Sequence, residues 1–271
     1  MKKTMLGMFS LLAAGSTAAD QYHIEASAEY NSGEFQETID YDSYAVSLTG
    51  YWNFVGEDTG VSLDEGTYSE AGFLSQASSL TVIHAEADIG TDDISSVDAR
   101  LVFGEGSILE FSGSDNPDSY SIAFGSYWGE NSATVVRLSK IDTDPLNGVD
   151  SDPLKVEVDT HTYVDLGDTA LSYDVVIGWA TADTLKNGSS ETDFSPVLGG
   201  GFTYYPIKNL GLGAALNWNE LEGVDVFTYS AGAEYFVIPR LSISVSYLFQ
   251  DAGDSIGEHN EAFSISLTGR I

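Results

Sequence analysis

The stretch that decides the fold is LSISVSYLFQ, residues 241–250, near the end of the chain. Its alternate positions are apolar, and the positions between them are mostly serine or amide; the apolar set is Leu241, Ile243, Val245, Tyr247 and Phe249. A period of two predicts an extended strand with one apolar and one polar face. Alternation alone leaves open whether the apolar face points into a protein core or out into lipid.

The composition excludes several classes of protein. The 271 residues include 42 acids against 10 Lys plus Arg, a formal net charge of −32, and no cysteine. An apolar content of 42% is too high for a disordered chain. The absence of cysteine rules out disulfides, thiol nucleophiles and cysteine-based zinc sites. The acidic excess argues against a nucleic-acid partner, because little is present to neutralise phosphates.

The first 19 residues have the features of a secretory signal peptide. Lys2 and Lys3 precede an apolar run over 4–14, and Thr17-Ala18-Ala19 suits signal peptidase. Cleavage after Ala19 leaves residues 20–271 with a net charge of −34. No other apolar run is long enough for a membrane helix, so any membrane has to be crossed as a closed β-barrel.

The mature chain is predicted to be all-β, with fourteen strands and almost no helical periodicity. Several strands reach 10–12 residues, the length that a tilted strand needs to cross a bilayer. Twelve strands is the fallback, because 97–113 can also be read as one distorted hairpin. The predicted strands are 22–30, 41–54, 79–89, 97–103, 107–113, 118–127, 132–141, 154–165, 169–182, 194–205, 209–219, 226–237, 240–250 and 260–271.

The connections between these strands alternate in length from the third strand on. Tight turns are predicted at 104–106, 128–131, 166–168, 206–209 and 238–239, and longer polar segments at 142–153, 183–193 and 251–259. Short turns on one rim and long loops on the other are typical of outer-membrane barrels, whereas a Greek-key sandwich has no reason to alternate. The exception is 55–78, a long connection on the short-turn rim, which is predicted to form a short helix or to fold toward the pore.

The two faces of the strands favour lipid on the outside. Aromatic residues gather toward strand ends, as interface girdles do, and the polar face consists largely of Gly, Ser, Thr and Ala rather than Lys and Glu. These features predict a transmembrane up-and-down antiparallel β-barrel in the Gram-negative outer membrane. The alternative is a secreted soluble β-protein with an apolar core.

The segment SEAGFLSQASSLTV, residues 69–82, is similar to a Glu-Ala-Ala-Phe-Leu-x-x-Ala-Ser stretch of acidic porin-like proteins of Gram-negative outer membranes. The mature chain resembles that family in overall pattern. The resemblance implies passive diffusion of small hydrophilic solutes and names no particular solute. Such barrels often end in an aromatic residue; this chain ends in Ile271, with Phe263 upstream on the same face.

The predicted external segments are strongly acidic. Residues 31–40, 90–96, 114–118, 142–153, 183–193, 220–225 and 251–261 contain 21 acids and one base, Lys186. A negative mouth enriches cations and repels anions, which predicts a cation-preferring pore. Solubility, adaptation to salt, or divalent-cation bridges to lipopolysaccharide would explain the same acids. The segment 142–152 has the composition of a calcium loop without its spacing, so no metal site or other cofactor is predicted beyond loosely bound divalent cations.

Strand parity predicts which charged residues face the lumen. A cross-pore arrangement of Arg and carboxylate groups would set a transverse field and a constriction; alternatively, the arginines neutralise lumen carboxylates and fill the barrel. The predicted lumen residues are Glu25, Glu29, His84, Glu86, Asp88, Arg100, Glu110, Arg137, Lys155, Glu157, Asp159, His161, Asp174, Glu234 and Arg270.

Three functions are compatible with these patterns. The first is a porin for small hydrophilic solutes. The second is a narrow or plugged barrel with a structural or adhesive role, and the third is a barrel hydrolase using His84 or His161. The sequence shows no convincing catalytic triad, so the protein is predicted not to be an enzyme. The expected partners are outer-membrane lipid, lipopolysaccharide and small hydrophilic or cationic solutes. Barrels of this size occur as monomers and as homotrimers, and the sequence assigns no interface.

Overall fold

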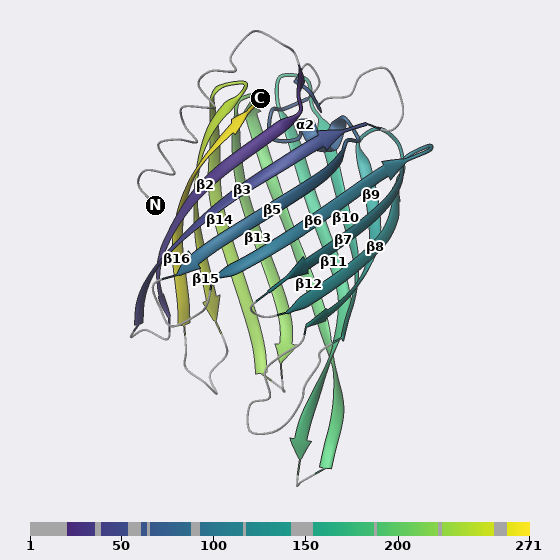
Figure 1. Cartoon of the computed structure of the whole chain (residues 1–271), viewed down its shortest axis with the longest axis vertical. Helices are drawn as coiled ribbons and strands as arrows, with labels where there is room; N and C mark the ends of the chain where they lie inside the picture. Colours follow the sequence, from purple (N-terminus) through teal and green to yellow (C-terminus); the bar gives the residue numbers. More distant parts are fainter. Residues whose placement is uncertain are drawn as a thin grey trace.

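The computed structural model describes residues 21–35, 39–53, 61–63, 66–87, 93–115, 118–141, 154–186, 189–221, 224–251 and 259–271. Fourteen antiparallel strands in these ranges form one closed barrel, in which each strand pairs with its neighbours in the chain and the last strand pairs with the first (Figure 1). The predicted signal peptide, residues 1–19, lies outside the described residues. Among the described residues, no helix has the length and apolarity needed to cross a membrane.

The barrel strands vary widely in length, from 8 to 19 residues. They are β2 (Ile24–Phe35), β3 (Ile39–Trp52), β5 (Ser78–Ala87), β6 (Ile94–Phe103), β7 (Ser107–Ser114), β8 (Ser119–Tyr127), β9 (Ser132–Ile141), β10 (Leu154–Asp165), β11 (Ala170–Lys186), β12 (Ser189–Ile207), β13 (Leu210–Leu221), β14 (Val224–Ile238), β15 (Leu241–Asp251) and β16 (His259–Arg270). Outside the barrel wall, β1 (Gln21–Tyr22) pairs with β4 (Val61–Ser62), and α2 (Ala71–Leu74) is a single helical turn.

The structure confirms the fourteen-strand prediction, and the twelve-strand fallback was wrong. Strands β6 and β7 are separate and pair in full register from Ser96–Ser114 to Phe103–Ser107. Their turn contains Gly104 and Gly106, both with positive φ, a conformation that glycine adopts without a steric penalty. The five tight turns lie on the rim that carries both chain ends, which is the periplasmic rim of such barrels.

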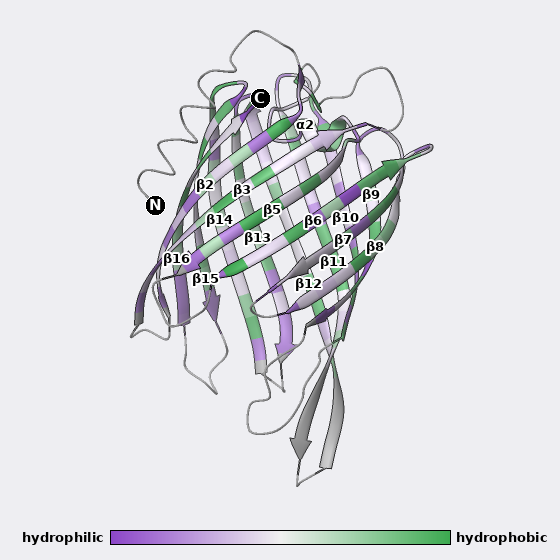
Figure 2. Cartoon of the chain, in the orientation of Figure 1, coloured by the Kyte–Doolittle hydropathy of each residue, from purple (hydrophilic) through white to green (hydrophobic). Residues whose placement is uncertain are grey.

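The apolar face of the 241–250 strand points outward. Ile243, Val245 and Tyr247 are 42%, 39% and 44% exposed, whereas Ser242 on the opposite face is 1% exposed. Their cross-strand neighbours continue the outer belt, since Val245 pairs with Ile265. Apolar stretches recur along the strands of the wall (Figure 2). Such a surface is stable only when hydrocarbon covers it, so the barrel spans a membrane.

The predicted long loops at 31–40, 183–193 and 220–225 were wrong. Pairing continues to Phe35–Ile39, Lys186–Ser189 and Leu221–Val224, so these connections are hairpins with short tips. The β11–β12 hairpin extends well beyond the barrel wall (Figure 1). The predictions ended each strand where apolar alternation stops, but the backbone ladder continues into water without it. The acidic segment 142–152 lies outside the described residues.

Candidate functional site in the barrel lumen

The connection between β3 and β5 folds into the periplasmic end of the barrel, which confirms the predicted helix and inward fold of 55–78 for the part that is described. We call residues 61–63 and 66–77 the plug. One side of the plug packs on Tyr22 of β1: Tyr22, Val61, Leu63, Ala71 and Ala77 form one buried cluster, with Tyr51 and Tyr68 against it. A buried apolar seam therefore joins the plug to the barrel wall at β3.

The other side of the plug packs against the opposite wall. Phe73 of α2 lies on a buried lumen cluster and stacks near Tyr127, with ring centroids 5.2 Å apart. Phe73 and Leu74 also pack on Tyr163, Ala170 and Tyr205 of β10, β11 and β12. The cluster beneath Phe73 comes from β6 to β9 and consists of Val102, Ile108, Ala123, Tyr127, Ala133 and Val135. The plug thus contacts walls on both sides of the lumen.

A polar contact fixes the middle of the plug. Glu70, the residue before α2, accepts hydrogen bonds from His161 Nε2 at 2.9 Å and from the Tyr205 hydroxyl at 2.7 Å. His161 Nδ1 lies 2.6 Å from Asp174 Oδ1. Carboxylates only accept, so both ring nitrogens donate and His161 is an imidazolium. We call Glu70, His161 and Asp174 the latch.

The electrostatics of Glu70 follow from these contacts. Burial opposes ionisation of its carboxyl, but the hydrogen bonds and charge of His161, with further bonds from Tyr205 and Ser172, hold its pKa below the ordinary 4.5. Glu70 is therefore ionised at neutral pH, which lets it bind the His161 cation. This charge-assisted contact is stronger than a neutral hydrogen bond.

Three basic side chains hold the periplasmic end together. Arg270 donates from Nη1 to the Tyr68 carbonyl at 2.8 Å and from Nε to Glu25 at 2.7 Å. Its guanidinium also lies between the rings of Tyr22 and Phe236, 4.9 and 4.7 Å from their centroids. Lys208 Nζ and Arg240 Nη2 donate to the carbonyls of Leu63 and Gln21 at 2.7 and 2.6 Å. Ser69 donates to Glu234 of β14.

The charged residues predicted from β6 to β10 form one network on a single wall. Arg100 Nη1 and Arg137 Nη2 bind the two oxygens of Glu110 at 2.8 and 2.7 Å, and Arg137 lies 3.5 Å from Asp159. Lys155 lies 2.6 Å from Glu157. The arginines therefore pair with carboxylates beside them, which is the neutralising alternative; the transverse arrangement across the pore was wrong.

The other predicted residues separate into two groups. His161, Asp174 and Arg270 lie on the lumen side, in the latch and the plug anchors. So do Glu25, Glu29 and Glu234: Glu25 binds Arg270, Glu29 lines a lumen cavity, and Glu234 accepts a hydrogen bond from Ser69. Glu86 and His84 lie on the outer face of β5. They share that face with Leu80 and Val82, which are exposed, and the residues between them, such as Ile83, face the lumen. The lumen placement of Glu86 and His84 was wrong because the outer face of β5 becomes polar where it leaves the apolar belt. Asp88 lies outside the described residues.

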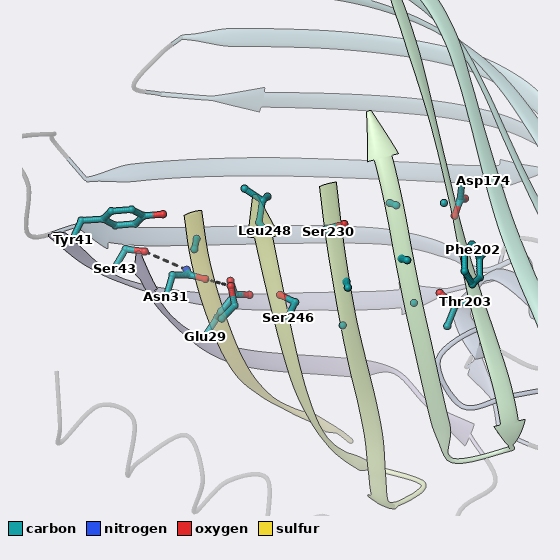
Figure 3. Close-up of a pocket in the computed structure, with 18 residues that line it drawn as sticks. Glu29, Asn31, Tyr41, Ser43, Asp174, Phe202, Thr203, Ser230, Ser246 and Leu248 are labelled. Carbon is teal, nitrogen blue, oxygen red and sulfur yellow. Dashed lines mark hydrogen bonds between the residues drawn. The ribbon is translucent and has the colours of Figure 1, made fainter. Parts of the chain in front are cut away.

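Described residues line lumen cavities of about 590, 470 and 320 Å³, of which the two larger ones hold the charged groups considered below. A cavity of about 470 Å³ lies against the charged wall and the plug, lined by Glu70, Phe73, Arg100, Arg137 and His161 among others. A second cavity of about 590 Å³, here called the chamber, lies against the wall of small residues from β11 to β16 with β2 and β3. Figure 3 shows its lining, with Asp174 and Glu29 on well-separated strands. Asp174 lines both cavities.

Sequence reasoning missed the functional residues of the plug, Glu70 and Phe73, and their wall partner Tyr205. The resemblance that singled out 69–82 covers both plug residues, but it gave them no role. A carboxylate at the start of a one-turn helix has no local sign of its partner, because His161 is 91 positions away in the chain.

No protein-family model matches the sequence, and no curated protein matches it. Solved structures do match. The outer membrane protein Omp33 of Acinetobacter baumannii has a TM-score of 0.64 and 14% identity, covering 94% of this chain and all of its own. A bacterial polysaccharide outer membrane secretin has a TM-score of 0.56 and 8% identity, covering 94% of this chain and 100% of its own.

These likenesses show a shared fold. Together with the closed barrel and its apolar belt, they show that the chain has the fold of a membrane-spanning β-barrel. The outward side chains are solvated by lipid, and the polar side chains and cavities lie inside. Any activity of the protein toward solutes therefore depends on the lumen.

Proposed function

We propose that the protein is an outer-membrane porin for the passive diffusion of small hydrophilic solutes, with a preference for cations. The observation that carries this proposal is the lumen itself, where a chamber of about 590 Å³ is lined mainly by hydroxyl, amide, glycine and alanine groups inside a membrane-spanning wall. Water and polar solutes are stable in such a space, whereas a protein core would fill it with apolar side chains.

The cation preference rests on the distribution of charge. The external segments contain 21 acids and one base. Inside, the charged wall is close to balanced, while the chamber is lined by the carboxylates of Glu29 and Asp174 and by no Lys or Arg among the described residues. A cation therefore meets negative potential from the mouth to the chamber, and an anion is repelled along the same path.

The plug would regulate the passage of solutes through this pore. Since it contacts both walls at the periplasmic end, we propose that the seated plug closes the exit and that diffusion requires its displacement. The same observation favours a second candidate, a permanently plugged barrel with a structural or adhesive role. The latch offers a way to distinguish the two functions, because one substitution breaks its ion pair and the effect on conductance can then be measured.

Purified protein refolded in planar bilayers tests both candidates. A porin gives discrete conductance steps, and in a potassium chloride gradient the reversal potential has the sign of cation preference. Absence of steps in the intact chain and in a latch-broken variant supports the structural role, and a reversal potential of anion sign overturns the preference.

A further inference from the structure

We propose that the chamber is a binding site for small polyhydroxylated cations, of which amino sugars are the simplest class. This inference rests on the proposed porin function and names the solute that its lumen favours. It starts from a difference between the two cavities. Beside the plug, the carboxylates already have cationic partners: Glu110 and Asp159 bind arginine, and Glu70 binds His161.

The carboxylates that line the chamber have fewer protein partners than the carboxylates beside the plug. The side chain of Glu29 makes no ion pair or hydrogen bond with any described residue, and it faces the chamber from β2. Asp174 uses Oδ1 for His161, and its side chain is 54% exposed, with Oδ2 free of described partners. The Glu29 carboxylate has no protein cation beside it among the described residues, which favours a cationic solute there, because screening by bulk water is weaker inside the barrel than at an open surface.

The remaining lining selects for hydroxyl groups. Hydroxyls and amides line the chamber between the two carboxylates: Asn31, Ser43, Thr203, Ser230, Ser246 and Ser264. Ser43 and Ser264 both bond to Asn31, so their positions are fixed before a solute enters. Hydroxyls both donate and accept, which suits a solute with several hydroxyl groups of its own.

Size agrees with this chemistry. A volume of about 590 Å³ is within the range of ligand-binding cavities, roughly 300–1,000 Å³. A hexosamine combines one ammonium group with four hydroxyls and fits this space with bridging water. Two neutral sugars keep the other four hydroxyls and lack the charge, so they are matched controls: glucose has a fifth hydroxyl in place of the ammonium group, and N-acetylglucosamine has an acetamide there.

Titration calorimetry on the refolded full chain tests the site without requiring an open pore. We expect D-glucosamine to bind about tenfold or more tightly than D-glucose or N-acetyl-D-glucosamine, since one charge-assisted contact contributes about one decade in affinity. Glu29→Gln should weaken glucosamine by a similar factor, and Asp174→Asn should weaken it less, because one ammonium group meets one carboxylate and Asp174 already pairs with His161. Asp168→Asn, in the periplasmic turn between β10 and β11, should leave binding unchanged.

Glu29→Gln is the decisive variant, because Asp174 also holds His161. Equal affinity for glucosamine and glucose, or full affinity in Glu29→Gln, overturns the site. Conductance is measured separately on the same preparations. If the barrel conducts potassium but does not distinguish glucosamine from glucose, the porin function stands and the binding site is refuted. If the barrel binds glucosamine but never conducts, even with the latch broken, the porin function is refuted and the binding site stands.

Discussion

His161 on strand β10 donates from Nε2 to the Glu70 carboxylate of the plug across 2.9 Å. One partner belongs to the fixed wall and the other to the segment that occupies the periplasmic exit. The contact is mostly shielded, with side-chain exposures of 25% and 10%. It is therefore the point at which one substitution changes plug seating without touching the lipid-facing wall.

Replacing Glu70 by Gln removes the charge while keeping the shape of the side chain. A hydrogen bond to a charged group contributes about 1.5–3 kcal/mol, so the unseated plug should become about tenfold or more populated. Single-channel recording should show a matching rise in open probability with unchanged unit conductance. Glu105→Gln, in an exposed turn on the same rim, is the matched control. Unchanged open probability in Glu70→Gln would show that the latch does not hold the plug.

The lowered pKa of Glu70 predicts a dependence on acid. Its folded-state pKa lies below the ordinary 4.5, so the ionised carboxylate stabilises the seated plug at pH values above 4.5, and this contribution is lost as the pH falls through the lowered value. The groups facing Glu70 are His161, Tyr205 and Ser172, with Asp174 behind the histidine. Open probability should rise only below about pH 4.5. In Glu70→Gln this rise in open probability at low pH should be absent. A rise of the same size in both proteins would mean that other carboxylates cause it.

Plug movement can be tested directly because the chain contains no cysteine. Ser69 on the plug and Glu234 on β14 are in hydrogen-bond contact, so cysteines at both positions can be joined by a short thiol-reactive bridge. Bridging should abolish conductance in Ser69→Cys/Glu234→Cys, and cleavage of a reducible bridge should restore it. The single variant Ser69→Cys, treated identically, should be unaffected. Conductance that survives complete bridging would place the solute path away from the plug.

Much of the barrel was predictable from the sequence because its solvent imposes a simple rule. Each strand that crosses hydrocarbon needs an apolar outer face, so a period of two marks both the strand and its orientation, as at Val245 and Ser246. The rule fails where hydrocarbon ends. It placed Glu86 in the lumen because it equated polar with inward, and it ended β11 and β12 too early because their distal residues pair in water.

The plug and the charged network depend on contacts that no local pattern records. Arg100 and Arg137 share Glu110 because the register aligns them across four neighbouring strands, β6 to β9, with Ala123 of β8 between Glu110 and Arg137. The alternation of a strand predicts which face a residue occupies, but it does not predict which residues lie opposite it. The latch joins residues 91 positions apart. The sequence could therefore predict that 55–78 departs from the barrel pattern, but not which wall residues hold it.

The network around Glu110 predicts how selectivity responds to one charge. Glu110 is 15% exposed and holds two arginines, so Glu110→Gln leaves an excess of positive charge on the wall of the inner cavity. The cation-to-anion permeability ratio, measured from reversal potentials, should fall. Arg137→Gln should change the ratio in the opposite direction. If both variants shift it the same way, or neither does, the permeating ions do not pass along this wall.

The direction of the apolar face at residues 241–250 can be tested with two adjacent positions. Val245 is 39% exposed on the outer belt, and Ser246 lines the chamber. An arginine on the lipid side near the middle of the membrane costs about 2–4 kcal/mol, so Val245→Arg should lower the free energy of unfolding in lipid vesicles by that amount. Ser246→Arg places the same side chain in the aqueous lumen, and it should fold with near-normal stability while reducing potassium conductance. A reversed result, with Ser246→Arg destabilised and Val245→Arg tolerated, would mean that the serine face is the one in contact with lipid.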